Sequence, residues 1–465
     1  MADFVEGEDM TLKKNHPAGY NGITDGVIWQ QLLLFFFPIL FGTFFQQLYN
    51  TVDAIIVGRF VGKEGLAAVG GSAAMIINLL VGFFIGLSSG ATVIISQFYG
   101  ARQQAKVSQA VHTAVAFSIA GGLVIMAVGL ITAPAALRAM GTPEETMADS
   151  ILYLRIYFLG LIGNLLYNMG AGILRAIGDS KRPLYFLIVG CMTNIVLDVV
   201  LVLFFHMGVA GAAWATILSQ LAAAVLVIAT LLKTDDMYRL NWREVRIHPD
   251  MLLRIIQIGL PAGLQSVMYS ASNIIIQSSV NALGTNVVAA WTAYGKIDVI
   301  YWTIINAFGI SITTFVGQNF GAGKLDRVYK GIRVCLGISA GATIFLSLLL
   351  YQFGQYIYLL FTTDAEVIAK GVEILHFLVP TLITYVCIEI LSGALRGIGD
   401  CWIPMIMTAL GVCLLRVVWI VVAVPLYPDI KTICFSYPLT WTVTSILFLV
   451  YFKWFSKIRK MKGIS

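Results

Sequence analysis

The stretch Gly172-Ile-Leu-Arg-Ala-Ile-Gly-Asp179 occurs a second time as Gly393-Ala-Leu-Arg-Gly-Ile-Gly-Asp400, 221 residues further along the chain. Three more pairs keep this offset: Pro183 with Pro404, Gln97 with Gln318, and Gly100 with Gly321. A repeat of this kind indicates two related halves. Within the motif, Gly can end a helix and Arg can face lipid headgroups, which predicts a structural role at a helix end.

The sequence is too apolar for a water-soluble fold. Of its 465 residues, 58% are hydrophobic and 12% are charged, and the mean hydropathy is +0.85. Soluble domains carry about 25% charged residues, whereas a helix that crosses a bilayer needs about 20 mostly apolar residues. Twelve such spans are predicted, at 28–56, 65–97, 105–133, 149–172, 183–204, 208–232, 251–281, 286–318, 328–350, 372–394, 403–424 and 432–455. The prediction is an all-α integral membrane protein.

The repeat and the span count together predict the domain organisation. Each half holds six spans, an even number, so both halves enter the membrane from the same side and form parallel-repeat six-helix lobes. The predicted parts are a cytoplasmic N-terminal segment (1–27), an N-lobe (28–232), a cytoplasmic interlobe linker (233–250), a C-lobe (251–455) and a basic cytoplasmic tail (456–465). Two such lobes suit alternating access by rocking.

The loop charges predict the orientation. The basic residues in loops on one side of the membrane are only Arg59, Lys63, Arg138, Arg155, Lys370 and Lys431, while nearly all others lie on the side of the termini. By the positive-inside rule both termini are cytoplasmic. The net charge of +6 therefore reports orientation and not nucleic-acid binding. Residues 1–26 lack an apolar stretch, so no cleavable signal peptide is expected.

Charges inside membrane spans are costly and are functional candidates. In the first half the deep carboxylates are Asp53 and Asp198, without a basic residue at the centre of any span. In the second half the deep charges are Lys296, Asp298, Glu389 and Arg416. The second set sums to zero and could neutralise itself, whereas the first leaves two negative charges.

Depth groups the two first-half aspartates with two polar neighbours. Asp198 lies ~22 Å from the inner face and Thr216 ~12 Å from the outer face, at 1.5 Å per residue. Asp53 comes late in the first span, and Asn194 lies one helical turn before Asp198. These four residues are the predicted cation-coupling site, in which Asp53, Asn194 and Asp198 could hold Na⁺ or the carboxylates could carry H⁺. Alternatively, Arg155 could pair with one aspartate in a buried polar lock.

A polar stripe on the first span suggests a cavity. Its members are Gln46, Gln47, Tyr49 and Asn50, and Pro38 can kink the same helix. With Lys296 and Asp298 they are the candidate lining of a substrate cleft; ordinary helix packing is the alternative. The sequence lacks a Gly-rich phosphate loop with a Lys-Ser/Thr pair, so ATP hydrolysis and enzymatic activity are not expected. No cofactor is expected beyond a coupling ion.

Several motifs in order resemble one family. They are Gln47-Leu-Tyr-Asn-Thr-Val-Asp53-Ala-Ile-Ile-Val-Gly-Arg59, the Gly-x-Leu-Arg-x-Ile-Gly-Asp repeat, Asn194-Ile-Val-Leu-Asp198 and Val316-Gly-Gln-Asn-Phe-Gly-Ala322. From Ile28 to Tyr451 the chain resembles the multidrug and toxic compound extrusion (MATE) transporters, in particular the bacterial DNA-damage-inducible type. The resemblance implies a V-shaped antiporter whose first-lobe cation site falls on Asp53, Asn194, Asp198 and Thr216. A second-lobe coupling site is not expected, because the seventh span has no carboxylate after Met251.

The predicted function is export of amphiphilic organic cations in exchange for H⁺ or Na⁺, by a monomer in the bacterial inner membrane. One alternative is a flippase for a lipid-linked saccharide, which would need several basic groups for the pyrophosphate. Another is a non-transporting membrane scaffold, which would not need two uncompensated aspartates.

Overall fold

The computed structural model describes residues 23–456, and within that range every regular element is a helix. Twelve helical spans are long and apolar enough to cross a membrane, which confirms the predicted transmembrane helices. The predicted basic tail apart from Ser456, and most of the predicted N-terminal segment, lie outside the described residues.

The first half of the chain supplies six spans. They comprise α1 (Ile28–Phe60), α2 (Lys63–Gly70) with α3 (Ser72–Gly100), α4 (Gln104–Ala139), α5 (Glu144–Ala176), α6 (Lys181–Asp198) with a π-helical continuation (Val199–Phe204), and α7 (Gly208–Lys233). Most extend several residues beyond the predicted apolar stretches. A single 3-10 turn, Trp242–Glu244, interrupts the connection to the second half.

The second half supplies the other six. They comprise α8 (Pro249–Asn281), α9 (Thr285–Gly321), α10 (Leu325–Tyr358), α11 (Ala365–Leu378) with α12 (Val386–Gly397), α13 (Trp402–Thr408) with α14 (Leu415–Leu426), and α15 (Ile430–Val450) with a π-helical end (Tyr451–Phe455). A 3-10 helical segment, Val379–Tyr385, joins α11 to α12. Pro380 near its start lacks an amide hydrogen, which explains the break. A π-helical segment, Ala409–Leu414, separates α13 from α14.

The repeated motif ends a helix in both halves. Gly178 and Gly399 have φ angles of +96° and +81°, a region that a residue without Cβ adopts at little cost. Directly after them, the amides of Asp179 and Asp400 donate to Leu174 and Leu395 at 2.9 Å. This is the hydrogen-bonded reversal that commonly closes a helix C-terminus, so the predicted helix-ending role of the glycine is confirmed. The arginines of the motif, Arg175 and Arg396, are half-buried, and their predicted contact with headgroups stays a prediction.

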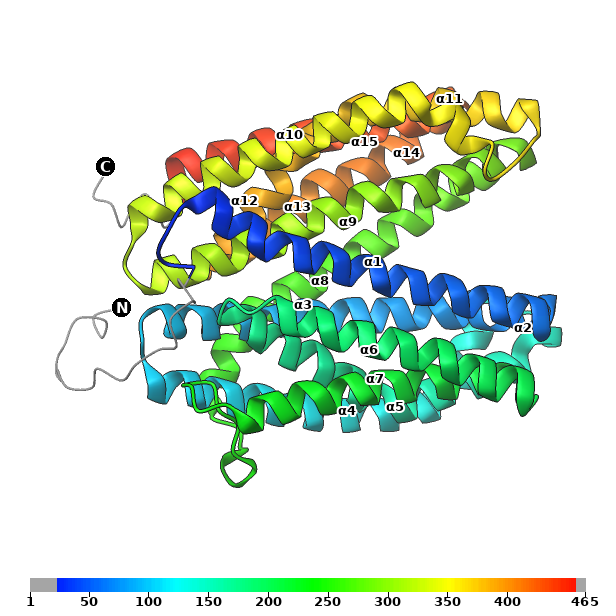
Figure 1. The fold of residues 1–465 in the computed structure, drawn as a ribbon. Coiled ribbons are helices and arrows are strands. Elements are labelled where there is room, and N and C mark those ends of the chain that lie inside the picture. Colours follow the sequence, from blue (N-terminus) through cyan, green and yellow to red (C-terminus); the bar gives the residue numbers. More distant parts are fainter. Residues whose placement is uncertain (1–22, 457–465) are drawn as a thin grey trace.

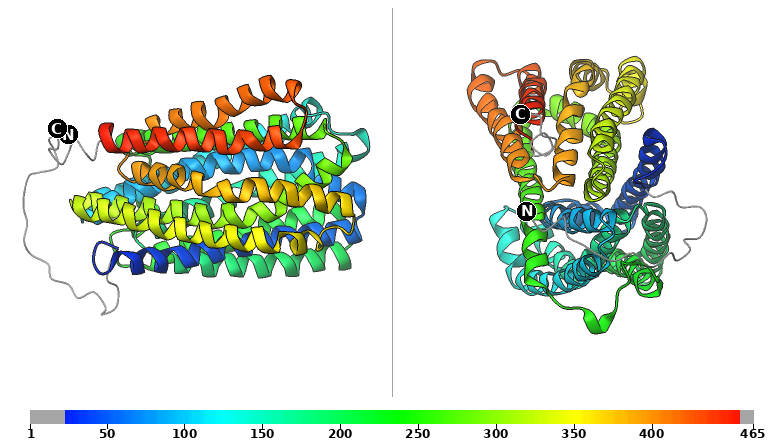
Figure 2. Two further views of the ribbon diagram at one scale, coloured as in Figure 1. Left: turned by 90° about the horizontal axis from the view of Figure 1, so that it is seen from above. Right: turned by 90° about the vertical axis from the view of Figure 1, so that its left-hand side faces the viewer.

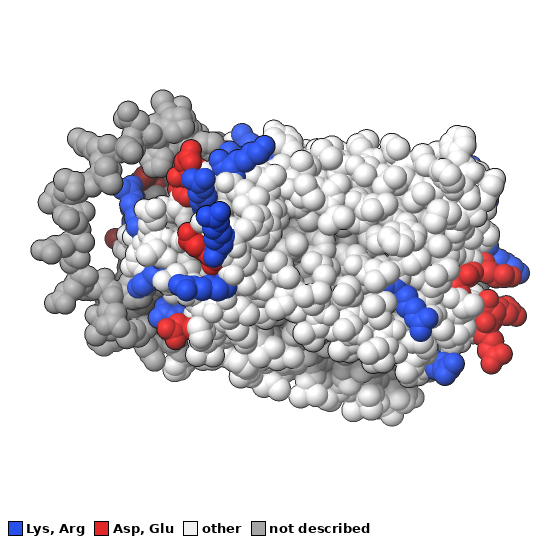
Figure 3. Space-filling view, turned by 90° about the horizontal axis from the view of Figure 1, so that it is seen from below, with Lys and Arg blue, Asp and Glu red and all other residues white. Residues whose placement is uncertain are grey.

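The helices form two lobes of nearly parallel rods (Figure 1). One layer holds α2 to α7 and the other α9 to α15, with α1 and α8 along the junction. Since α1 begins and α15 ends at the same end of the molecule (Figure 2), we call that end the basal end. The layers diverge away from it (Figure 1). On the face in Figure 3, charged side chains gather at the two ends and leave a broad, nearly uncharged band between them, as a bilayer requires.

Glycines bring the lobes into backbone contact where α3 crosses α8. A Cβ atom at Gly86 would overlap the backbone of Gly263, and one at Gly90 would overlap Gly259 and Ile255. Small residues at helix crossings allow this close approach in membranes. Because these positions lie in the basal two thirds of α3, the interlobe contact is concentrated toward that end.

The core contacts of α1 are divided between the lobes. Leu32, Phe35 and Phe36 of its first half share a buried cluster with α9 and α12, while Ile56 and Val57 of its second half belong to the core of the first lobe. The helix therefore connects the two lobes, with Pro38 inside its first half.

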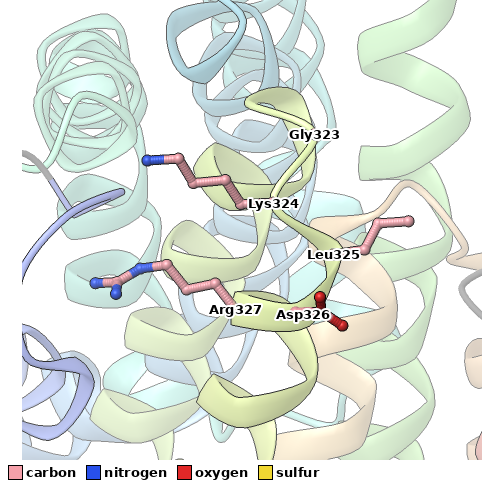
Figure 4. A pocket seen from close by; sticks show the side chains of 5 residues that line it. All are labelled: Gly323, Lys324, Leu325, Asp326 and Arg327. Carbon is pink, nitrogen blue, oxygen red and sulfur yellow. The ribbon is translucent and has the colours of Figure 1, made fainter.

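The segment before α1 is fastened to the second lobe. Arg327 at the start of α10 donates to the carbonyls of Gly26 and Asp25, both at 2.8 Å, and Lys324 forms an ion pair with Asp25 at 2.8 Å. The side chains of Lys324 and Arg327 extend to the same side of the turn, whereas Asp326 points elsewhere (Figure 4). The segment that leads into α1 is thereby tied to the start of α10.

Candidate functional site

Two buried carboxylates lie close together in the first lobe. Asp53 comes from the second half of α1 and Asp198 from the end of α6, and these two helices pack on each other. Their exposed fractions are 8% and 0%, so neither is solvated by bulk water. They are near enough for the charge of Asp53 to act on Asp198. Within the described residues, neither forms an ion pair, since no basic group lies within 4 Å.

Asn194 and Thr216 complete the predicted set. Asn194 lies one turn before Asp198 on α6 and is fully buried, and Thr216 on α7 is 6% exposed. The Thr216 hydroxyl donates to the Ala212 carbonyl at 3.0 Å, which leaves its oxygen lone pairs available as ligands. The packing of α6 on α7 and of α1 on α6 brings these three helices, and with them the four residues, to one region of the lobe.

The polar atoms of this cluster are unusual in lacking partners. Among the described residues, both side-chain atoms of Asn194, both carboxylate oxygens of Asp198 and one oxygen of Asp53 are buried without a hydrogen bond. Buried polar groups are nearly always satisfied, so a concentration of unsatisfied ones calls for an explanation. Carboxylate and amide oxygens are suitable ligands for a hard cation, and the carboxylates are equally suitable acceptors of a proton.

The alternative of a polar lock is not supported. Arg155 on α5 has an exposed side chain, and no ion pair joins it to Asp53 or Asp198 within the described part of the chain. Among the residues that the structure describes, no basic side chain therefore lies close enough to neutralise the first-lobe carboxylates.

The polar stripe of α1 divides into two faces. Tyr49 lies four residues before Asp53, within electrostatic range of it, and interacts with Gln46 and with Gln220 of α7. Gln47 and Asn50 are exposed, and within residues 23–456 no side-chain hydrogen bond or ion pair joins them to Asp53, Asn194, Asp198 or Thr216. Only half of the stripe therefore faces the acidic cluster.

Three residues near the cluster were missed by the sequence analysis. Gln220 follows Thr216 by one turn on α7, a spacing that could have identified it. Tyr153 and Tyr157 come from α5; Tyr153 is within electrostatic range of both aspartates, and Tyr157 interacts with Gln220. Buried tyrosines are too common in membrane helices for sequence to single these out.

The deep charges of the second lobe are not paired with each other. Asp298 accepts hydrogen bonds from Trp302 Nε1 at 2.6 Å and Tyr294 at 3.2 Å, and Glu389 accepts one from Tyr385 at 3.3 Å. Arg416 lies over the ring of Tyr437, 4.1 Å from its centroid. Among the described residues no ion pair joins these charges, so the expectation of self-neutralisation is wrong in the sense of ion pairing. Aromatic and hydroxyl groups contact Asp298, Glu389 and Arg416 separately, and Nε of Arg416 is buried without a hydrogen bond. Lys296, the fourth, is exposed.

The second lobe lacks the acidic cluster. At the 221-residue offset, Asn194 corresponds to Leu415, Asp198 to Trp419 and Thr216 to Tyr437. The repeat therefore preserves the helical frame but not the carboxylate, amide and hydroxyl side chains at these three positions.

A two-lobe frame of twelve membrane helices with a buried acidic cluster in one lobe defines a repeat-built membrane transporter. Two segments, residues 38–200 and 261–422, match the family model MatE, and the chain accordingly belongs to the MatE family of multidrug and toxic compound extrusion transporters. The family resemblance predicted from the sequence is confirmed, and the family is one of transporters, not enzymes.

Curated relatives and solved structures agree with this assignment. The chain is 28% identical over 460 residues to the probable multidrug resistance protein YoeA of Bacillus subtilis, covering 97% of both chains. It is 24% identical over 377 residues to the multidrug export protein MepA of Staphylococcus aureus, covering 80% of this chain and 82% of that one. An outward-facing multidrug resistance MATE transporter structure is 23% identical, with a TM-score of 0.87, and covers 96% of this chain and 100% of that chain. The structural likeness establishes the fold.

Proposed function

We propose that this protein is a secondary active antiporter that exports amphiphilic organic cations in exchange for H⁺ or Na⁺. The observation that carries the proposal is the enclosed, unneutralised pair Asp53 and Asp198, with the unsatisfied atoms of Asn194 beside it. The proposal places the coupling ion in the first lobe, on these three residues and Thr216.

Energetics support an ion at this position. Removing an unpaired carboxylate from water costs several kcal/mol, roughly, even after relaxation. Two of them in one enclosed region repel each other as well. At least one must therefore hold a proton, or the two must share a bound cation. Binding of a proton or of a cation changes the net charge of the cluster. The lobe therefore has an ion-bound and an ion-free state that differ in charge.

Antiport follows if the ion and the drug prefer different states. When the ion leaves, repulsion between the carboxylates favours another arrangement of α1 against α6. Because α1 is also packed on the second lobe, such a change is passed to the interlobe junction. Ion binding from the opposite side would restore the first arrangement and release the drug, a coupling free energy between two sites.

The proposed substrates are cationic or neutral amphiphiles. The candidate lining is Gln46, Gln47, Tyr49 and Asn50 of α1 with Lys296 and Asp298 of α9. Aromatic faces attract organic cations. The second lobe offers Trp302 beside Asp298 and Trp291, whose ring is tilted against that of Tyr294 with centroids 5.6 Å apart. The similarity to proteins named for multidrug resistance and export is consistent with such substrates.

The proposed location is the bacterial inner membrane, with the basal end in the cytoplasm and the protein acting as a monomer. Basic residues at the basal end, including Arg102, Arg182, Lys324 and Arg327, support this orientation through the positive-inside rule. The proposed lobes are residues 28–232 and 251–455, with the linker 233–250 between them.

The flippase alternative is less well supported. A pyrophosphate-binding cleft would present several accessible basic groups, whereas Arg416 is buried against Tyr437 and donates to Thr440 at 3.2 Å. A non-transporting scaffold gives no reason for the unneutralised aspartates.

The decisive experiment is substrate-dependent ion movement in proteoliposomes, with a proton gradient or a Na⁺ gradient imposed in turn. A cationic dye should be driven against its concentration gradient by one of the two. Preferential movement of anionic substrates, or a lack of response to either gradient, would overturn the proposal.

A further inference from the structure

A reciprocal pair of hydrogen bonds joins the lobes at the basal end. Gln97 of α3 donates from Nε2 to the carbonyl of Gly397 at 2.8 Å, and Gln318 of α9 donates from Nε2 to the carbonyl of Ala176 at 2.6 Å. Both donors and both acceptors are 221 residues apart in sequence. The two hydrogen bonds are therefore related by the internal repeat: the glutamine of each half donates to the helix-end carbonyl of the other half.

The acceptors are the carbonyls that their own helices leave free. In α5 the carbonyls of Ile173, Leu174 and Arg175 accept from Ile177, Asp179 and Gly178, and in α12 those of Ala394, Leu395 and Arg396 accept from Ile398, Asp400 and Gly399. The last carbonyl of each helix, that of Ala176 in α5 and that of Gly397 in α12, is left without a backbone donor from its own C-terminal turn. A helix C-terminus needs an external partner for such groups, and here the partner comes from the opposite lobe.

The backbone is shaped to admit these side chains. A Cβ atom at Gly178 would lie 3.6 Å from Nε2 of Gln318, and one at Gly399 would lie 3.8 Å from Nε2 of Gln97. A Cβ atom at Gly100 would overlap the backbone of Gln318, and one at Gly321 would overlap the backbone of Gln97. The backbones of α3 and α9 are thus in contact beside Gln97 and Gln318. This contact holds both glutamine side chains within hydrogen-bond distance of their acceptors.

We propose that Gln97 and Gln318 form a two-part clasp that holds the basal end closed and must open in each transport cycle. The proposal rests on the proposed function, because only alternating access requires that end to open. Both bonds are between neutral groups, so each can be exchanged for water at modest cost. The strength of the two hydrogen bonds therefore does not depend on the ion. The free-energy difference between the closed and open arrangements comes instead from the charge state of Asp53 and Asp198.

The clasp is tested by the accessibility of the surface behind it. Ser96 is fully buried and lies against Gly317 across the α3–α9 contact. A Ser96→Cys reporter, in a protein with its native cysteines replaced, is placed in lipid nanodiscs and labelled with a membrane-impermeant thiol reagent. Gln97→Met and Gln318→Met should each raise the labelling rate about fivefold, the factor that corresponds to one neutral hydrogen bond, and the double variant should exceed tenfold.

A matched control and a second variant keep the test decisive. Gln277→Met removes a glutamine that bonds within α8 to Asn281 at 2.9 Å, and it should leave the labelling rate unchanged. If the methionine variants do not fold, Gln97→Asn and Gln318→Asn keep the amide but shorten its reach, and should give the same increase. A double variant labelled within twofold of the parent, or a parent already labelled rapidly, would overturn the clasp. Nanodiscs contain neither gradient nor drug, so failure of the antiport proposal would be seen separately.

Discussion

The ring of Phe36 stacks on the ring of Phe308 with centroids 4.0 Å apart and an interplanar angle of 18°. Phe36 belongs to α1 and Phe308 to α9, and both are buried. Seventeen residues later the same helix carries Asp53 in the first lobe. The stack therefore attaches one end of α1 to the second lobe while its other end holds a carboxylate of the acidic cluster.

Phe36→Ala is expected to weaken this attachment. We expect a loss of about 1–2 kcal/mol, below the 3–5 kcal/mol typical of soluble cores, because lipid is as apolar as the core and mainly packing is lost. Phe37→Ala is the matched control, since Phe37 is the next residue on the helix and is 48% exposed. Thermal melting of the two purified variants compares them directly; equal melting temperatures would argue against a structural role for the stack.

Asp53→Asn and Asp198→Asn should each reduce gradient-driven export at least tenfold while the protein still folds. Asparagine keeps the volume and an acceptor oxygen but removes the negative charge, so a proton has no carboxylate to bind and Na⁺ loses a charged ligand. The buried charge that costs stability is also gone. Glu389→Gln is the control, because Glu389 is a half-buried carboxylate of the second lobe that accepts a hydrogen bond from Tyr385. Normal export by both aspartate variants under an imposed gradient would show that the cluster is structural.

Binding of Na⁺ should be visible as stabilisation without any transport. A cation at 100 times its Kd stabilises the folded state by about 2.7 kcal/mol. Melting of the wild-type protein at pH 8 in NaCl is compared with melting in KCl at equal ionic strength. A higher melting temperature in NaCl that disappears in Asp198→Asn identifies Na⁺ as the ion, whereas equal melting in both salts assigns the coupling to H⁺.

The ion pair of Asp25 with Lys324 should contribute little, with a defined pH dependence. The hydrogen bond from Lys324 holds the pKa of Asp25 below its ordinary value. A lowered folded-state pKa means that the stabilisation is present above the unfolded pKa of about 3.9 and is lost as the pH falls through the lower folded value. Asp25→Asn should therefore cost about 0.5 kcal/mol or less at pH 7. The difference between variant and wild type should vanish in 1 M salt; a difference that persists there would contradict the assignment.

The proposed orientation predicts which loops are reached from outside the cell. In a protein without its six native cysteines, a cysteine at Thr363 should react with an impermeant reagent added to intact cells. A cysteine at Arg243 in the linker should react only after the membrane is opened. The reverse pattern would invert the orientation and move the basal end to the exterior.

The sequence by itself determined the number of spans, the repeat and the positions of the buried acids. Each of these depends on local information: a run of apolar residues long enough to cross lipid, or identity at a fixed offset. Tertiary structure alone decided that α1 divides its packing between lobes, that Tyr49 but not Gln47 belongs with the acidic cluster, and that Arg416 stacks on Tyr437 instead of pairing with an acid. It also decided that Gln97 and Gln318, whose equivalence was visible in sequence, reach across to the opposite halves. The physical reason is that a bilayer imposes its length and polarity on each helix separately, whereas the face that a helix turns to its neighbours depends on close packing with helices hundreds of residues away.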